Sequence, residues 1–259
     1  MDTSNDSPSV KSAQRTLRIL EVLGEEDQPL SLPELQERTG YPRSSLHALA
    51  RTLRDAGWLQ TDAGGSRYQL GTRALLTGTA YLDKDPAIPL AQKALEDLRE
   101  ELGHTVHFGR REQASVIYLA SRESMVAVRQ VYRIGRLVPA SLTGLGQALL
   151  ADLTDGEVAE LLPEVLPTHT EFSIARRDDL LTELKQVRDR GWALELDQGV
   201  VGLGCVAAVV PYRIPGTDAI SCSVPSDELR DESRRDELAA VLVRHTHELA
   251  AQLRRAGIR

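Results

Sequence analysis

The spacing of apolar and polar positions over residues 30–71 predicts two short helices joined by a tight turn. Ser31 stands three residues before Glu34, which is the pattern of a capping box at the start of a helix. The segment TGYP then ends this helix, because Gly40 tolerates a positive φ and Pro42 suits the first turn of a following helix. The pattern therefore predicts a helix-turn-helix.

The second of these helices is predicted over residues 42–56 and has two different faces. Its apolar positions fall at i, i+3, i+4 and i+7 and form one buried stripe, made of Leu46, Leu49, Ala50 and Leu53. Basic residues recur beside this stripe, and two serines lie at the exposed leading end. A positive helix of this kind suits base and phosphate contacts in the major groove of DNA. The candidate DNA-contacting residues are Arg43, Ser44, Ser45, His47 and Arg51.

A Gly-rich hairpin and two flanking helices complete this motif. Strands are predicted over residues 58–61 and 67–70, and Arg67 is placed to touch a phosphate or the minor groove. A helix over residues 12–24 should pack through Ala13, Leu17, Leu20 and Leu23, and a connecting helix should cover residues 72–82. The order of elements predicts a disordered tail over residues 1–10, a winged helix-turn-helix over 11–71 and a linker helix over 72–84.

From residue 85 to residue 259, helical and strand-like runs are interspersed. Helices are predicted over residues 88–103, 144–152 and 178–191, with a long closing helix over 227–255. Strands are predicted over residues 105–108, 115–121, 125–130, 204–210 and 219–224. Because these elements do not alternate strictly as βαβ units, the pattern favours an α+β sensor-like domain over residues 85–259.

The distribution of charge keeps DNA binding open despite an acidic chain. The 259 residues contain 31 basic and 38 acidic side chains, a net charge of −7. Between residues 41 and 73, however, five arginines stand against two aspartates, a balance of +3 on the proposed DNA-reading surface. The sequence shows neither a long apolar run nor the pattern of a signal peptide, so we expect a cytoplasmic protein without a membrane span.

Cysteine and histidine usage gives little sign of metal chemistry. Cys205 and Cys222 lack CxxC spacing, so a structural zinc site or a disulfide framework is not expected, and a reducing compartment fits. The pairs His104/His107 and His245/His247 also lack a metal-binding spacing, which favours solvated or packing roles.

Three separated motifs resemble the IclR (isocitrate lyase regulator) family of bacterial transcription factors. They are RTLRILEVL with LSLPELQERTGYPRSSLHALARTLRDAGWLQ, then VPASLTGLGQALLA, then RGWALELDQGVVGLGCVAAVV with AISCSVP. The resemblance implies a winged helix-turn-helix joined by a helix to a GAF-like effector-binding domain. It further implies a repressor that binds a palindromic double-stranded DNA operator as a homodimer or a dimer of dimers. A small metabolite, such as an organic acid or a polyhydroxyl compound, would control its operator affinity.

The resemblance also implies where the effector binds. In relatives that bind small α-keto acids, the site is a glycine-containing helix start, an acidic residue, a cysteine-bearing strand and two alternating serines. The matching residues are Gly144, Leu145, Gly146, Glu195, Cys205, Ser221 and Ser223. Backbone N–H groups at the helix start would receive a carboxylate, and serines two apart on a strand share one face. Glu195 stands where aspartate is usual, Val224 where glycine is common, and Gly204 where arginine is frequent.

Two other functional classes stay open at this point. A thiol redox-responsive regulator would use Cys205 and Cys222, although Cys222 should point away from the flanking serines on its strand. A cysteine-dependent enzyme would pair Cys205 with His104, His107 or His169, but no fixed spacing links them. The leading interpretation is a DNA-binding regulator with a small-molecule effector, and it assigns no catalytic residue, metal or cofactor.

Overall fold

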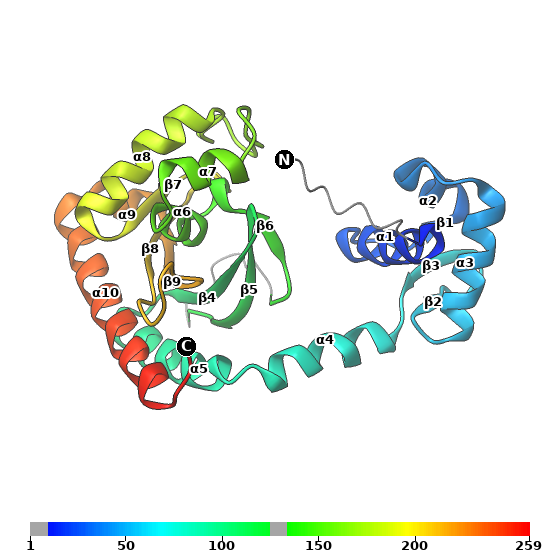
Figure 1. Ribbon diagram of the computed structural model, residues 1–259, viewed down its shortest axis with the longest axis horizontal. Coiled ribbons are helices and arrows are strands. Elements are labelled where there is room, and N and C mark those ends of the chain that lie inside the picture. The colour runs from blue at the N-terminus through cyan, green and yellow to red at the C-terminus, as the bar shows by residue number, and fades with distance from the viewer. Residues whose placement is uncertain (1–9, 125–133) are drawn as a thin grey trace, which may run out of the picture. The chain divides into compact units, whose positions relative to one another are not determined.

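The computed structural model describes residues 10–124 and 134–259. The tail expected over residues 1–10 falls almost wholly outside this range, and so does the strand expected over residues 125–130. The chain divides into two compact units, Met1–Lys84 and Asp85–Arg259, whose elements are labelled in Figure 1. Across the described residues, no helix combines the length and the apolar character needed to cross a membrane.

The first unit is the predicted winged helix-turn-helix. Its helices are α1 (Lys11–Glu25), α2 (Leu32–Thr39), α3 (Arg43–Asp55) and α4 (Thr72–Lys84). Its strands are β1 (Leu30–Ser31), β2 (Leu59–Thr61) and β3 (Arg67–Leu70), which form an antiparallel sheet in the order β1-β3-β2. β1 was not predicted, because it has only two residues and one of them, Ser31, is also the N-cap of α2. Ser31 pairs with Arg67 across the sheet.

The turn between α2 and α3 follows from the local sequence. Ser31 Oγ accepts a hydrogen bond from Glu34 N at 3.5 Å, and Ser31 N donates to Glu34 Oε2 at 2.7 Å, so the capping box is confirmed. Gly40 ends α2 with a φ of 68°, a left-handed conformation that glycine adopts without strain. Pro42 is the N-cap of α3, which places the next helix directly after the turn.

The core of the first unit joins the apolar faces of its first three helices. The buried residues of α2 and α3 are Leu35, Leu46, Ala50 and Leu53. The packing face predicted for α1 was right for Leu20 and Leu23, which pack in or against the core, and wrong for Ala13 and Leu17, which are exposed. Ile19 and Val22 reach the core in their place.

The second unit is an α+β domain built on one sheet, which confirms the predicted class. Its helices are α5 (Ala87–Leu102), η1 (Ala140–Leu142, a short 3-10 helix), α6 (Gly144–Ala151), α7 (Asp155–Leu161), α8 (Arg177–Arg190), α9 (Ser226–Arg230) and α10 (Glu232–Arg255). Its strands are β4 (Thr105–Glu112), β5 (Ser115–Arg122), β6 (Leu137–Pro139), β7 (Ala193–Leu196), β8 (Leu203–Val209) and β9 (Asp218–Pro225). They pair antiparallel in the order β6-β5-β4-β9-β8-β7.

Helices cover both faces of this sheet. α5 and α10 lie against one face, α6 lies against the other, and α8 packs on α6 (Figure 1). Because neighbouring residues on a strand point to opposite faces, Cys205 and Ser221 lie on the α6 face while Val206 and Cys222 lie on the α5–α10 face. A polar side chain on either face must therefore find its partners inside the protein or in a ligand.

The long closing helix is present, but it begins at Glu232 and not at Asp227, because the short helix α9 occupies the start of this segment. α9 ends at Arg230, and Asp231 then accepts hydrogen bonds from Ser233 N and Arg234 N at 3.0 and 3.3 Å. An aspartate that caps a new helix in this way interrupts the one before it. Sequence analysis also missed β6, η1, α7 and β7, which are three to seven residues long and too short for a clear periodic pattern.

Candidate functional site

The exposed face of α3 carries most of the residues predicted to contact DNA. Arg43, Ser44, His47 and Arg51 are exposed, and steps of four residues keep Arg43, His47 and Arg51 on one side of the helix. Pro42 supplies no side-chain cap, so the first backbone N–H groups of α3 are open to an external acceptor. The helix therefore offers charged, hydroxyl and backbone donors at one end.

Ser45 differs from these residues because it is half-buried and already bonded. Its hydroxyl accepts a hydrogen bond from Arg15 Nη1 at 3.1 Å, and the Arg15 guanidinium lies 5.2 Å from the centroid of the Tyr41 ring. Sequence analysis did not single out Arg15. The fold places its positive charge beside the leading end of α3, where it adds to the basic surface.

Arg67 is held by the protein itself at the start of β3. Its Nη1 donates to Pro29 O at 2.8 Å, and its Nη2 donates to Glu34 Oε1 at 3.2 Å. The pKa of Glu34 is lowered mainly by its hydrogen bonds with Ser31 and, to a smaller extent, by Arg67. Arg67 thus joins the wing to the start of α2, and a DNA contact would have to share its guanidinium with Glu34.

Strand register brings the predicted effector residues of the second unit to one face of its sheet. Cys205 on β8 pairs with Glu195 on β7 and with Ser223 on β9. Ser221 stands two residues before Ser223, so both hydroxyls face the same side. We call Glu195, Cys205, Ser221 and Ser223 the polar row. Three strands contribute to this row, and it lies under α6.

The start of α6 lies directly over the polar row. A Cβ on Gly144 would come within 3.0 Å of Cys205 Sγ, so glycine lets the helix approach β8 closely. A Cβ on Gly146 would fall 2.1 Å from a carbonyl oxygen of η1, and the Gly146 N–H donates to Thr143 Oγ1 at 3.0 Å. Because the cap uses this N–H, the amides at the helix start that the cap leaves free are those of Gly144 and Leu145.

The environment of the Cys205 thiol reflects this convergence. Burial raises the pKa of the thiol to about 12, and the charge of Glu195 contributes to the rise. Hydrogen bonds with the hydroxyls of Ser221 and Ser223 and with the N–H of Gly144 act in the opposite direction. These groups therefore surround one sulfur atom. A thiol with so high a pKa is protonated at neutral pH, which is the opposite of an activated nucleophile.

Glu195 is buried and takes two backbone hydrogen bonds. Its Oε1 accepts from Gln198 N at 2.6 Å and from Gly199 N at 3.1 Å. Burial raises the pKa of Glu195 to about 7, while these two hydrogen bonds lower it and the charge of Asp197 raises it. Near neutral pH, this carboxyl group therefore exists in both protonation states.

A second polar group, which sequence analysis did not include among the effector residues, lies on the same face of the sheet. His107 on β4 pairs with Ser221, and its Nδ1 lies 2.8 Å from Ser121 Oγ on β5. The ring meets Tyr118 edge to face, with 5.2 Å between centroids. Burial lowers the pKa of His107 to about 4, so the ring is neutral at pH 7. Only the pairing of β4 with β9 brings His107 beside the polar row, and no local pattern marks it.

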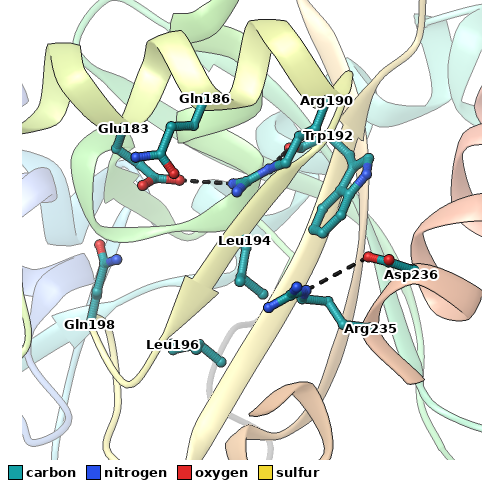
Figure 2. Close-up of a pocket in the computed structure, with 9 residues that line it drawn as sticks. All are labelled: Glu183, Gln186, Arg190, Trp192, Leu194, Leu196, Gln198, Arg235 and Asp236. Carbon is teal, nitrogen blue, oxygen red and sulfur yellow. Dashed lines mark hydrogen bonds and ion pairs between the residues drawn. The ribbon is translucent and has the colours of Figure 1, made fainter. Parts of the chain in front are cut away.

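A cavity of about 530 Å³ lies on the opposite face of β7 (Figure 2). It is lined by Glu183, Gln186, Arg190, Trp192, Leu194, Leu196, Gln198, Arg235 and Asp236. None of the predicted effector residues lines it. Arg190 pairs with Glu183 at 2.8 Å, and Arg235 lies 3.8 Å from Asp236, so the charges of its lining are balanced. Gln198 links this cavity to the polar row, because its backbone N–H holds Glu195.

The two cysteines lie on opposite faces of the sheet, as the strand alternation predicted. Cys205 faces α6, whereas Cys222 pairs with Val206 and faces α5 and α10. Both are free and buried, and burial raises the pKa of both thiols. This placement is poor for a disulfide within the chain and for thiolate chemistry.

The histidines singled out in the sequence have packing and pairing roles. His245 is buried with its Nε2 at 2.9 Å from Glu101 Oε2, and His104 Nε2 lies 3.3 Å from Glu228 Oε2. Within residues 10–124 and 134–259, no group of three or more His, Cys, Asp or Glu side chains could hold a metal ion.

An exposed basic helix in a winged domain, together with a buried polar row in a separate α+β domain, defines a DNA-binding regulator with a sensing domain. Residues 12–63 match the family model described as the IclR helix-turn-helix domain. Residues 79–251 match the model described as bacterial transcriptional regulator IclR C-terminal. The chain belongs to the IclR family of bacterial transcriptional regulators, and the expected fold is confirmed.

Relatives cover both units of the chain. The HTH-type transcriptional regulator XynR of Escherichia coli is 30% identical over 207 residues, which is 78% of this chain and 81% of XynR. The transcriptional repressor IclR of the same organism is 27% identical over 252 residues, covering 95% and 91% of the two chains. An IclR homologue from Microbacterium hydrocarbonoxydans, solved in complex with 4-hydroxybenzoate, has a TM-score of 0.76 at 18% identity over 94% of this chain and 99% of its own, which shows a shared fold.

Proposed function

We propose that this protein is a cytoplasmic transcriptional repressor whose affinity for its DNA operator is controlled by a small metabolite bound in the second unit. Membership of the IclR family supports operator binding, and the related Escherichia coli repressor supports repression over activation. The bound 4-hydroxybenzoate of the Microbacterium homologue supports a small-molecule effector. The observation that carries the proposal is the polar row beneath the start of α6, because buried polar groups gathered in this way favour a polar ligand.

The chemistry of this site favours an organic acid or a polyhydroxyl compound. The N–H groups of Gly144 and Leu145, together with the hydroxyls of Ser221 and Ser223, can all donate hydrogen bonds to an anionic or hydroxylated ligand. Glu195 would repel a carboxylate but would accept a hydrogen bond from a ligand hydroxyl. Cys205 would form the wall between these two ends, and Gly146 would hold α6 in place.

DNA binding is assigned to the leading end and exposed face of α3. Arg43, Ser44, His47 and Arg51 would contact bases and phosphates in the major groove, and Ser45 would do so while bonded to Arg15. Arg67 would anchor the wing on the DNA backbone. The first unit, over residues 11–71, would then act as the DNA-binding domain, with residues 72–84 as the linker helix and residues 85–259 as the effector-binding domain.

A second copy of this chain would complete the DNA-binding assembly. On α4, Leu75 is 67% exposed and Leu76 is 68% exposed, and on α1 Leu17 is 60% exposed. Large exposed apolar side chains of this kind are typical of a surface that a partner covers. Because one recognition helix reads only a few base pairs, a homodimer or a dimer of dimers on a palindromic operator would supply the required specificity.

The test is operator release by an organic acid in the full chain and in a double variant. DNA selected by the protein from a randomised pool serves as operator, and pyruvate, gluconate and 4-hydroxybenzoate are screened by thermal shift. Ser221→Ala with Ser223→Ala should keep operator binding and raise the midpoint of release about tenfold or more, because each lost hydrogen bond costs about 1 kcal/mol.

Cys222→Ala is the matched control, since this residue lies between the two serines and faces the other side of the sheet. Its release midpoint should stay near that of the unmodified chain. Equal midpoints in the unmodified chain and the double serine variant would place the effector elsewhere.

A further inference from the structure

Gln147 on α6 is a fully buried side chain whose oxygen is unsatisfied. Its exposure is 0%, and Oε1 accepts no hydrogen bond from any residue that the structure describes. A buried amide oxygen without a donor costs free energy, and such groups are uncommon in native proteins. The oxygen is therefore suited to a donor that arrives with a ligand.

The orientation of this amide is fixed by its other end. Gln147 Nε2 donates to Ser141 O at 3.1 Å and to Gln198 Oε1 at 2.8 Å. The carbonyl of Ser141 can only accept, so exchanging the amide nitrogen and oxygen would set two acceptors against each other. The unsatisfied atom is therefore the amide oxygen, Oε1, which can only accept a hydrogen bond.

Gln147 is linked to the Glu195 end of the polar row through Gln198. It follows Gly144 by three residues on α6, so the two residues share the side of the helix that approaches the sheet. Its partner Gln198 holds Glu195 Oε1 through its backbone N–H at 2.6 Å. A chain of two contacts thus joins the buried amide to the buried carboxyl group, and both groups offer acceptor oxygens.

We propose that Gln147 Oε1 accepts a hydrogen bond from a hydroxyl group of the effector, at the end of the site where Glu195 lies. The inference rests on the proposed function and makes it more specific: the effector is a hydroxy-carboxylate, with its carboxylate at the start of α6 and the serines. A hydroxyl carries one proton, which it donates to Gln147 Oε1, and its oxygen can accept a hydrogen bond from Glu195 when that carboxyl group is protonated. A carboxylate that lacks the hydroxyl leaves Gln147 Oε1 without a donor and binds more weakly.

The experiment compares acids that differ by one hydroxyl group. Two matched pairs are used with the full chain, lactate against propionate and 4-hydroxybenzoate against benzoate, so that small aliphatic and aromatic effectors are distinguished. Affinities come from calorimetry or thermal shift. The unmodified chain should prefer the hydroxylated member of one pair by about tenfold or more, since a site built for a hydroxyl rejects its absence.

Gln147→Met should reduce this preference about five- to tenfold, the worth of one hydrogen bond, and leave the affinity for the parent acid within about twofold. Gln198→Met is the matched control, because it removes a partner of Nε2 and leaves the Gln147 oxygen in place; it should keep the preference. If Gln147→Met folds poorly, Gln147→Asn can replace it. The side chain of Asn is shorter by one methylene, so its oxygen lies farther from the ligand, and this variant should also lose the preference for the hydroxylated acid.

The outcomes separate the inference from the proposed function. An unmodified chain that binds neither member of either pair contradicts the hydroxy-carboxylate effector, and the proposed role of Gln147 falls with it. An unmodified chain that binds these acids without preference overturns only the inference. So does a Gln147→Met variant that retains the preference, or one that loses affinity equally for both members of a pair.

Discussion

α3 and α6 are the two helices that the proposed function directs at a ligand, and their surroundings are opposite. α3 buries one stripe and exposes Arg43, His47 and Arg51 to water. α6 is buried along all eight of its residues and carries no charged side chain. α3 can therefore present its own side chains to DNA, whereas α6 presents mainly backbone N–H groups, with neighbouring strands supplying most of the side chains.

The difference shows how each type of site is stabilised before a ligand arrives. Exposed arginines on α3 are solvated, so their charge costs little until DNA binds. On the α6 face, burial shifts the pKa of Glu195 upward and that of His107 downward, because each side chain is disfavoured in its charged form. A substitution on the exposed face of α3 should therefore cost little stability, whereas a substitution among the buried groups on the α6 face should cost more.

The largest contrast is expected between neighbouring residues of α3. Leu46→Ala should lower the free energy of unfolding of the first unit by about 2–5 kcal/mol, because Leu46 is fully buried in its core. His47→Ala should change stability by less than about 0.5 kcal/mol and weaken operator binding. Urea denaturation and gel-shift titration of both variants test this. A His47→Ala variant with unchanged operator affinity would remove this residue from the DNA-reading face.

In the second unit, Gly146→Ala should destabilise by about 3 kcal/mol or more, because the added Cβ would lie 2.1 Å from a backbone oxygen of η1. Gly78→Ala is the control, since a Cβ there meets no atom within 4 Å. This substitution within α4 should be neutral or stabilising by up to about 1 kcal/mol. Denaturation curves for the two variants that coincide would show that α6 can move away from η1 at little cost.

The pH dependence of stability should reveal Glu195. Its pKa is about 7 in the folded chain and near 4.5 when unfolded. Between pH 4.5 and pH 7, the folded state therefore holds a proton on Glu195 that the unfolded state has lost. The stability that this proton supplies is complete below pH 4.5 and is lost as the pH rises through 7, a change of up to about 3 kcal/mol. Glu195→Gln should remove this slope, which the difference between the two stability curves against pH measures. Parallel curves would mean that the backbone hydrogen bonds from Gln198 and Gly199 keep Glu195 ionised in the folded chain.

The smallest effect is expected at the wing. Arg67→Ala should weaken binding to all DNA sequences alike and reduce the slope of log affinity against log salt by about one, the value for one lost phosphate contact. Glu34→Gln preserves a capping-box side chain and removes the charge that faces Arg67, so it should strengthen binding slightly. A change in melting temperature for Arg67→Ala with an unaltered salt slope would make Arg67 a structural residue of the wing.

Local sequence was sufficient for most of the first unit. The capping box at Ser31, the left-handed Gly40 and the stripe of α3 are short-range features, and each acts within a few residues of its own position. Where prediction failed there, as with Ala13 and Leu17 on α1, the periodicity allowed more than one buried side. Packing against Leu35 and Leu46 selected Ile19 and its neighbours.

The effector residues came from family resemblance, and the sequence by itself gave no reason for them to meet. Glu195, Cys205 and Ser223 lie on three strands, and only the order β9-β8-β7 and its register place them side by side. The same holds for His107, which the pairing of β4 with β9 adds to this face. These groups become buried only when α6 covers the sheet. Burial then shifts the pKa of Glu195 and leaves the oxygen of Gln147 unsatisfied. The sequence could not predict this, because desolvation depends on everything that surrounds a group and not on its neighbours in the chain.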